Sequence, residues 1–133
     1  MIELITALAS LSLLLSSMTV HATEPDPMST WIDDLFFCES QDNPNNKHLD
    51  VDGYYVYGAG QFKKYTFINN ARKFNFYGDV SDEEIFSHIY DRQAQKVLVR
   101  NIIQSNYNDY NLWHNCTVGN AKNKVGKPPI PHN

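Results

Sequence analysis

Two cysteines, Cys38 and Cys116, constrain the fold of this chain more than any other feature of its sequence. The chain opens with a stretch typical of a secretory leader, and in an oxidising compartment an even number of cysteines usually forms disulfides. We therefore expect a Cys38–Cys116 bridge. In the chain-entropy model, closing a loop of this length stabilises a fold by about 4–5 kcal/mol. The bridge would tie the first helix of the domain to its last structured segment.

The first 22 residues have the layout of a signal peptide. A largely apolar run of 12 residues, 4–15, is followed by Val20-His21-Ala22, which has the small-x-small pattern of a cleavage site. This run is shorter than the ~20 apolar residues that span a bilayer. We therefore expect cleavage after Ala22 and export to the periplasm or the medium. Because Glu3 stands where basic residues are usual, an uncleaved membrane anchor is the alternative.

Removing residues 1–22 from the 133-residue chain leaves 111, which suffice for one compact domain. We expect an N-terminal extension over 23–29, the domain over 30–116, and a disordered tail over 117–133 that is rich in lysine, proline and asparagine. The formal net charge of the chain is −4, so it lacks the excess of basic residues that is typical of nucleic-acid-binding proteins. We therefore expect no nucleic-acid partner. We expect a monomer, without a stable membrane span once the leader is removed.

Helical patterns dominate the domain. Ser81 followed three residues later by Glu84 has the form of a capping box, and apolar residues then recur at helical spacing. Turn residues instead surround the aromatic stretch after Gly53. The predicted elements are a helix over 31–39 capped by Thr30, a hairpin around 50–57, a helix over 63–72 and one long helix over 82–104. The fold class is therefore α+β, mostly α-helical, with a short β-hairpin region.

Glu39 is the strongest candidate for a catalytic residue in the sequence. It follows Cys38 at the end of the first predicted helix and precedes a glycine-rich and aromatic-rich segment that contains Gly60-Gln61-Phe62. A carboxyl group among apolar side chains has its ionised form disfavoured, so its pKa rises and it can protonate a leaving sugar oxygen. The alternative is a solvated carboxylate at a helix end, because most glutamates lie at the surface.

A cysteine nucleophile and a metal site are the competing chemistries. Cys38 would serve as a nucleophile if a histidine lay beside it, but the second cysteine gives it a structural role. Asp50-Val51-Asp52-Gly53 has the start of a calcium loop, yet the twelfth position, where such a loop needs glutamate, is Gln61. No histidine pair has zinc spacing. We expect neither a metal nor another cofactor.

The domain also contains an ordered set of motifs that resembles a known family. The motifs are Trp31, Cys38-Glu39-Ser40, Asn43, Gly53-Tyr54-Tyr55, Gly60-Gln61-Phe62, Thr66-Phe67, Gln93, Gln95 and Trp113-His114-Asn115-Cys116. Together they resemble the transglycosylase-like domain of resuscitation-promoting factors. The Glu-Ser pair with Gly-x-Gly-Gln-Phe is similar to the wider lytic transglycosylase group of the lysozyme-like superfamily. The resemblance covers residues 30–116 and implies a small lysozyme-like domain.

The resemblance implies an enzyme that cleaves the β-1,4 bond between N-acetylmuramic acid and N-acetylglucosamine in peptidoglycan, with Glu39 as the general acid. Its partner would be the glycan strand. Gln61 and Thr66 match positions that line the sugar-binding cleft of that family, and Phe67 stands where the family usually has tryptophan. Phe67 would keep a stacking face without the indole N–H donor. Tyr55 is expected to stack on sugar as well.

The outcome of cleavage depends on whether a second carboxylate is present. Hydrolysis usually needs a nucleophile or a base at a defined distance from the acid, and Asp50 and Asp52 are the nearby candidates. Lytic transglycosylases, by resemblance, use one glutamate as acid and then base, and the sugar's C6 hydroxyl attacks to give a 1,6-anhydro end. With one convincing acid, transglycosylation is favoured over a lysozyme reaction. A catalytically weak peptidoglycan-binding or inhibitor-like module is the alternative function.

Overall fold

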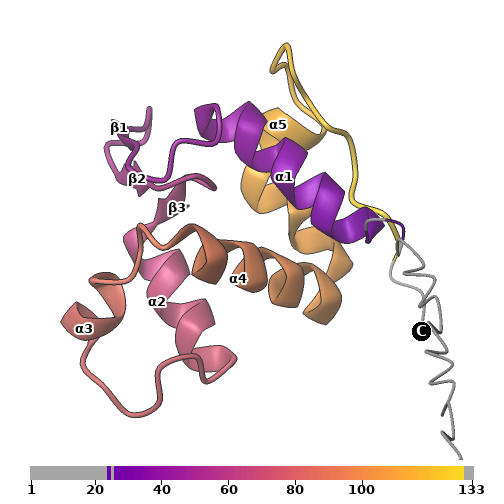
Figure 1. Ribbon diagram of the computed structural model, residues 1–133. Helices are drawn as coiled ribbons and strands as arrows, with labels where there is room; N and C mark the ends of the chain where they lie inside the picture. The colour runs from indigo at the N-terminus through magenta and orange to yellow at the C-terminus, as the bar shows by residue number, and fades with distance from the viewer. Residues whose placement is uncertain (1–23, 25, 131–133) are drawn as a thin grey trace, which may run out of the picture.

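The computed structural model describes residue 24 and residues 26–130, and the expected leader lies outside these residues. Its elements are α1 (Pro27–Ser40), β1 (Lys47–Leu49), β2 (Tyr55–Tyr57), β3 (Phe62–Lys63), α2 (Lys64–Lys73), α3 (Asp82–Phe86), α4 (Arg92–Ser105), the 3-10 helix η1 (Tyr107–Trp113) and α5 (His114–Thr117). Helices and a three-stranded antiparallel sheet confirm the predicted α+β, mostly helical class (Figure 1). Among the helices described, none is both long and apolar enough to cross a membrane.

Helix α1 begins earlier than predicted, at Pro27. The Asp26 carboxylate caps it by accepting a hydrogen bond from the Met28 N–H at 3.1 Å. Proline suits the first helical position because its missing N–H would have no partner within the helix. The prediction that Thr30 caps this helix is therefore wrong, and residues 27–29 of the predicted extension are helical. The helix ends at Ser40, which leaves Glu39 in its last turn.

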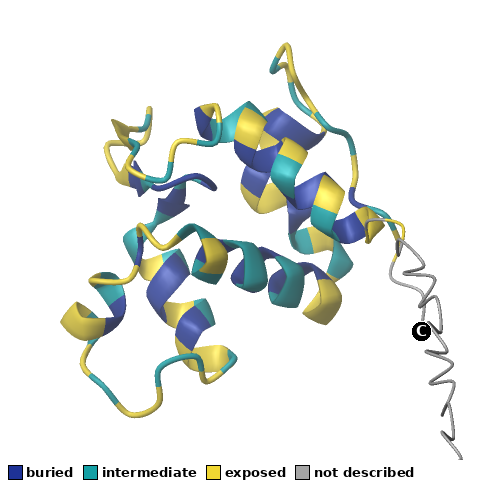
Figure 2. Cartoon of the chain, viewed as in Figure 1, coloured by how far each residue is buried: buried dark blue, intermediate teal, exposed yellow. Residues whose placement is uncertain are grey.

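The core forms where the apolar faces of α1, α2 and α4 meet η1 (Figure 2). Its completely buried side chains include Ile32, Leu35, Phe36, Phe67, Leu98, Val99 and Ile103. At the edge of this core, the Arg92 guanidinium forms ion pairs with Asp33 at 2.9 Å and with Asp42 at 2.7 Å. Lys96 also binds Asp33, at 2.7 Å. These half-buried ion pairs hold the first turns of α4 against α1 and the loop that follows it.

The predicted long helix over 82–104 is wrong in its middle, because residues 87–91 separate α3 from α4. Ser81 caps α3 as predicted, and its hydroxyl accepts from the Glu84 N–H at 3.2 Å. Asp91 is a second cap, and its carboxylate accepts from the Ala94 N–H at 3.0 Å. Between the two caps Ile89 is buried, and its carbonyl accepts a hydrogen bond from a core side chain instead of from a helical N–H.

The segment after Cys116 follows a defined path along α1 as far as residue 130 (Figure 1). The Trp31 indole N–H donates to the Gly126 carbonyl at 3.2 Å, and the Tyr107 hydroxyl donates to the Pro128 carbonyl at 2.7 Å. The prediction of a disordered tail over 117–133 is therefore wrong for residues 117–130, and 131–133 lie outside the described residues. The composition of this segment could not show that core aromatic residues supply its hydrogen bonds.

The sheet has the strand order β1-β2-β3 and presents two different faces. His48 lies opposite Val56, and Val56 lies opposite Lys63. Since successive residues of a strand point to opposite faces, these three side chains share one face, which we call the inner face. On the other side is the outer face, where β1 and β2 place Lys47, Leu49, Tyr55 and Tyr57.

Candidate active site

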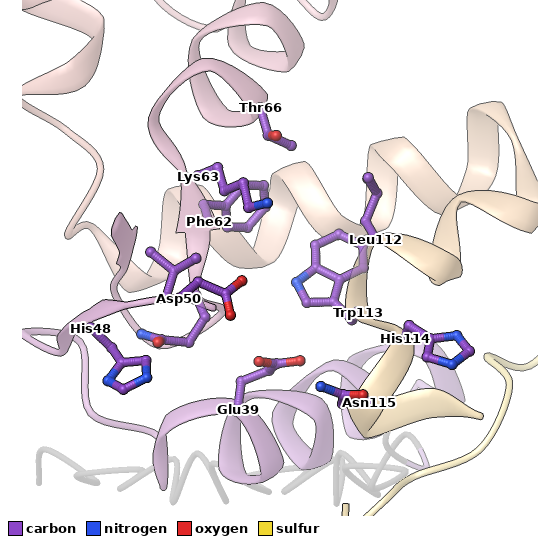
Figure 3. Close-up of a pocket in the computed structure, with 12 residues that line it drawn as sticks. Glu39, His48, Asp50, Phe62, Lys63, Thr66, Leu112, Trp113, His114 and Asn115 are labelled. Carbon is purple, nitrogen blue, oxygen red and sulfur yellow. The ribbon is translucent and has the colours of Figure 1, made fainter. Parts of the chain in front are cut away.

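A cleft of about 530 Å³ lies between the end of α1, the inner face of the sheet, the start of α2 and the junction of η1 with α5. Four residues that the sequence predicted for the site line it: Glu39, Asp50, Gln61 and Thr66. Figure 3 shows the Glu39 carboxylate directed into this space from α1, with the Asp50 side chain facing it from the hairpin. The predicted site therefore gathers residues from three separate parts of the chain.

Glu39 has the electrostatic property that a general acid needs. Burial raises its pKa from the ordinary value of 4.5 to about 7, and the negative charge of Asp50 adds to the rise. A carboxyl group with this pKa is partly protonated at neutral pH, so it can donate a proton and later accept one. Burial is the larger of the two causes.

Ser40 fixes the end of α1 relative to the glycine-rich segment. Its hydroxyl donates to the Ala59 carbonyl at 2.7 Å and accepts a hydrogen bond from the Asn43 N–H at 3.1 Å. Ser40 is itself buried, so these bonds lie out of water. In the Glu39-Ser40 pair, the first side chain enters the cleft and the second holds the helix end that carries it.

The glycine-rich segment packs directly against Gln95 of α4. A Cβ atom on Gly58 would lie 2.3 Å from the Gln95 Nε2 atom, and a Cβ on Gly60 would lie 2.7 Å from the Phe36 ring. The buried Gln95 amide accepts from the Gly60 N–H at 2.8 Å and donates to the Tyr57 carbonyl at 2.9 Å. Only glycine fits this close backbone approach, which fixes the position of the residue that follows.

That residue, Gln61, has a backbone φ of 53°, in the left-handed region that side chains rarely adopt. Its amide nitrogen donates to the Gly58 carbonyl at 2.8 Å and to the Asn46 side chain at 3.3 Å. Both N–H groups of the amide are thus used within the protein, which leaves the amide oxygen as an acceptor for a ligand. Thr66, in the first turn of α2, places its side chain on the same cleft.

The opposite wall of the cleft comes from the junction of η1 with α5, where Leu112, Trp113, His114 and Asn115 line it. Trp113 is buried, and its indole N–H donates to the Gly60 carbonyl at 2.8 Å. This bond holds the junction against the glycine-rich segment. None of these residues was predicted for the site, although their position beside a predicted half-cystine was a signal that could have found them.

The predicted disulfide is present between Cys38 and Cys116, with the two Cα atoms 5.9 Å apart. It joins α1 to α5. Glu39 and Asn115, which both line the cleft and lie side by side in Figure 3, are each the immediate neighbour of a bridged cysteine. Because its sulfur is bonded to another sulfur, Cys38 is not the nucleophile that the alternative required.

Asp50 and Asp52 have different surroundings. Asp50 lines the cleft, whereas Asp52 forms an ion pair with Lys63 outside it, and that hydrogen bond lowers the Asp52 pKa. Lys63 itself lines the cleft from β3 and His48 lines it from β1, and neither was predicted. The alternation of side chains along the strands would have assigned both to the inner face. Of the two candidate second carboxylates, only Asp50 is placed to act with Glu39.

Phe67 and Tyr55 do not line the cleft, so neither contributes to this site. Phe67 is completely buried and packs edge to face on Phe62, with ring centroids 5.9 Å apart. It belongs to the core because it lies on the face of α2 that packs inward. Tyr55 lies on the outer face of the sheet, since the neighbouring Val56 occupies the inner face.

No protein-family model matches this chain, and no curated protein or solved structure matches it significantly. Within the described ranges, no group of three or more histidine, cysteine, aspartate or glutamate side chains is arranged to hold a metal ion. The chemistry of the site must therefore be argued from its own residues.

Proposed function

We propose that this protein cleaves the glycan strands of peptidoglycan, at the β-1,4 bond between N-acetylmuramic acid and N-acetylglucosamine, with Glu39 as the general acid. The observation that carries the proposal is a carboxyl group with a pKa of about 7 inside a cleft of about 530 Å³, facing a second carboxylate. The motifs that resemble the transglycosylase-like domain of resuscitation-promoting factors support it, because Glu39, Gln61 and Thr66 line that same cleft.

The proposed first step is acid-catalysed cleavage. The protonated Glu39 carboxyl gives its proton to the glycosidic oxygen while the bond from that oxygen to C1 breaks. The electron pair of the bond leaves with the oxygen, and positive charge develops on the sugar ring. Asp50, which lines the cleft, would stabilise this charge. Gln61, Thr66 and Asn115 offer hydrogen bonds that would orient the N-acetyl and hydroxyl groups of the sugars.

Transglycosylation is the favoured second step. Glu39, now a carboxylate, takes a proton from the C6 hydroxyl of the same sugar, and the C6 oxygen attacks C1. The product is a 1,6-anhydro end, Glu39 recovers its proton, and no water is consumed. A pKa near neutrality suits a group that acts first as acid and then as base.

Hydrolysis is the second candidate, and the position of Asp50 favours it. Asp50 faces Glu39 in the cleft, where it would activate water or attack C1 directly (Figure 3). Asp52 does not compete for this role because it is paired with Lys63 outside the cleft.

Digestion of purified peptidoglycan, followed by mass spectrometry of the products, tests the proposal. We expect 1,6-anhydromuramyl ends. Reducing ends would instead indicate a lysozyme reaction that uses Asp50. If the wild-type protein binds the strands without releasing products, the alternative of a peptidoglycan-binding or inhibitor-like module holds. The expected leader, which lies outside the described residues, supports a periplasmic or secreted site of action.

A further inference from the structure

The outer face of the sheet carries an exposed group of aromatic rings that the cleft does not use. We call it the outer aromatic cluster; it consists of Tyr55, Tyr57, Phe86 and Tyr90, with the ammonium groups of Lys47 and Lys64 over its rings. Tyr55 is 46% exposed and Tyr90 is 38% exposed. The rings come from β2, α3 and the loop before α4, so the fold gathers them from separate elements.

Tyr57 fixes the arrangement of the cluster. Its ring centroid lies 5.2 Å from that of Phe86 and 5.9 Å from that of Tyr90, both edge to face, and 6.4 Å from that of Tyr55. The backbone carbonyl of Tyr57 also accepts a hydrogen bond from the buried Gln95 amide. The rings are therefore held in place before any ligand arrives, so binding to them would cost little side-chain entropy.

The two lysines give the cluster a positive charge. The Lys47 Nζ atom lies 4.4 Å from the Tyr55 ring centroid, and the Lys64 Nζ atom lies 4.8 Å from that of Phe86. Aromatic faces stack on the apolar faces of pyranose rings, and ammonium groups bind carboxylates. A glycan whose sugars carry carboxylates matches both features. Muramic acid is such a sugar wherever its stem peptide has been removed, because its lactyl group then ends in a free carboxylate, and where the peptide remains, the carboxylates of the peptide lie next to the strand.

We infer that the outer aromatic cluster is a second binding site for peptidoglycan glycan strands, separate from the cleft. This inference rests on the proposed function. The inner face of the sheet lines the cleft, while the outer face holds a further stretch of polymer. A site of this kind keeps the enzyme on an insoluble substrate between cleavage events and has no effect on substrates that are too short to reach it.

A binding experiment tests the inference without requiring turnover. Glu39→Gln serves as the background, and the probe is glycan strands freed of peptides and proteins by amidase and protease treatment. Adding Tyr55→Ala and Tyr90→Ala should weaken binding at least ~5-fold, because two exposed aromatic faces are removed. Phe37→Ala is the matched control, since Phe37 is 54% exposed and lies on α1, which contributes no ring to the cluster. Binding of the control should not change.

Lys47→Gln provides a second variant, because an exposed lysine can be replaced without disturbing the core. We expect weaker strand binding at low salt and a smaller loss of binding when salt is added. Unchanged affinity in both the tyrosine and the lysine variants would overturn the inference. Weaker binding to whole cell-wall preparations, with unchanged binding to the stripped strands, would indicate a protein partner and overturn it as well.

Activity measurements separate this inference from the proposed function. With Glu39 intact, the double tyrosine variant should digest soluble tetrasaccharides at the wild-type rate and insoluble peptidoglycan several-fold more slowly. Equal losses on both substrates would mean that the cluster only supports the fold, which contradicts the inference. If the wild-type protein digests neither substrate, the proposed function fails, whereas the binding comparison in the Glu39→Gln background still decides the second site.

Discussion

At the scale of single residues, the chemistry depends on what surrounds Glu39. The helix end that carries it is fixed by Ser40, and the cleft around it excludes enough water to raise its pKa to about 7. Asp50 contributes to this value through its charge, so a change at Asp50 should alter the titration of Glu39.

Glu39→Gln should lower turnover of peptidoglycan by at least ~10²-fold while glycan binding is largely retained. The amide keeps the size and hydrogen bonding of the carboxyl group but has no proton to transfer. Product release measured by chromatography, together with strand co-sedimentation, checks both parts. Asp52→Asn is the matched control, because Asp52 lies outside the cleft and should have little effect. Unchanged cleavage by Glu39→Gln would remove Glu39 from the reaction.

The raised pKa of Glu39 also predicts how stability depends on pH. In the unfolded chain the carboxyl ionises near 4.5, whereas in the folded protein it holds its proton until about pH 7. The contribution of Glu39 to the free energy of unfolding is therefore fully present below pH 4.5, and it is lost as pH rises towards 7. Glu39→Gln should be more stable than the wild type by about 1–3 kcal/mol at pH 8, with a smaller difference at pH 4. Urea unfolding at both pH values tests this, and an equal difference at the two would contradict it.

The titration of Glu39 should also appear in the pH dependence of the cleavage rate. Since the first step needs the protonated carboxyl, the cleavage rate should fall as pH rises above about 7. A pH profile of initial rates on soluble oligosaccharides gives the comparison. Asp50→Asn should shift the falling limb to lower pH, because it removes the negative charge that disfavours ionisation of Glu39. A limb that does not move would show that Asp50 has little influence on the acid.

At the scale of elements, the glycine-rich segment positions the cleft by packing on α4. Gly58→Ala should destabilise the fold by about 2–4 kcal/mol, since its φ is +78° and the new Cβ would collide with Gln95. Gly78→Ala is the matched control: its φ is +69°, but the Cβ would meet open space, so only about 1 kcal/mol of backbone strain is expected. Thermal unfolding measures both variants. Equal losses would mean that contact with Gln95 does not matter.

Elements with strong local signals could be predicted from the sequence, and those set by distant contacts could not. Ser81 starts α3 because its own side chain supplies the cap. The break at 87–91 depends instead on burial of Ile89 and on a hydrogen bond from Gln95, which a local pattern does not contain. The position of Tyr55 outside the cleft could not be predicted, because side-chain direction in a strand depends on register, and a shift of one residue reverses it.

At the scale of the whole molecule, the site is assembled by contacts between distant parts of the chain. Glu39, Gln61 and Thr66 could be proposed for it because each belongs to a recognisable motif. Asn115 and Trp113 also belong to a motif, but their place at the cleft could not be assigned, because only the folded chain brings the η1–α5 junction to it. The path of residues 117–130 was unpredictable for a similar reason, since core aromatic side chains bind its backbone.

The bridge between Cys38 and Cys116 joins the two walls of the cleft across 78 residues of sequence, so its loss should affect the molecule as a whole. Replacing both cysteines with serine should lower the free energy of unfolding by about 2–5 kcal/mol. Activity should fall only as far as the folded fraction falls, because neither sulfur takes part in the proposed reaction. Thiol titration of the denatured wild type without reductant should find no free thiol, and calorimetry with assays at low temperature should separate stability from turnover. A folded but inactive double-serine variant would show that the bridge also sets the distance between Glu39 and Asn115 that cleavage requires.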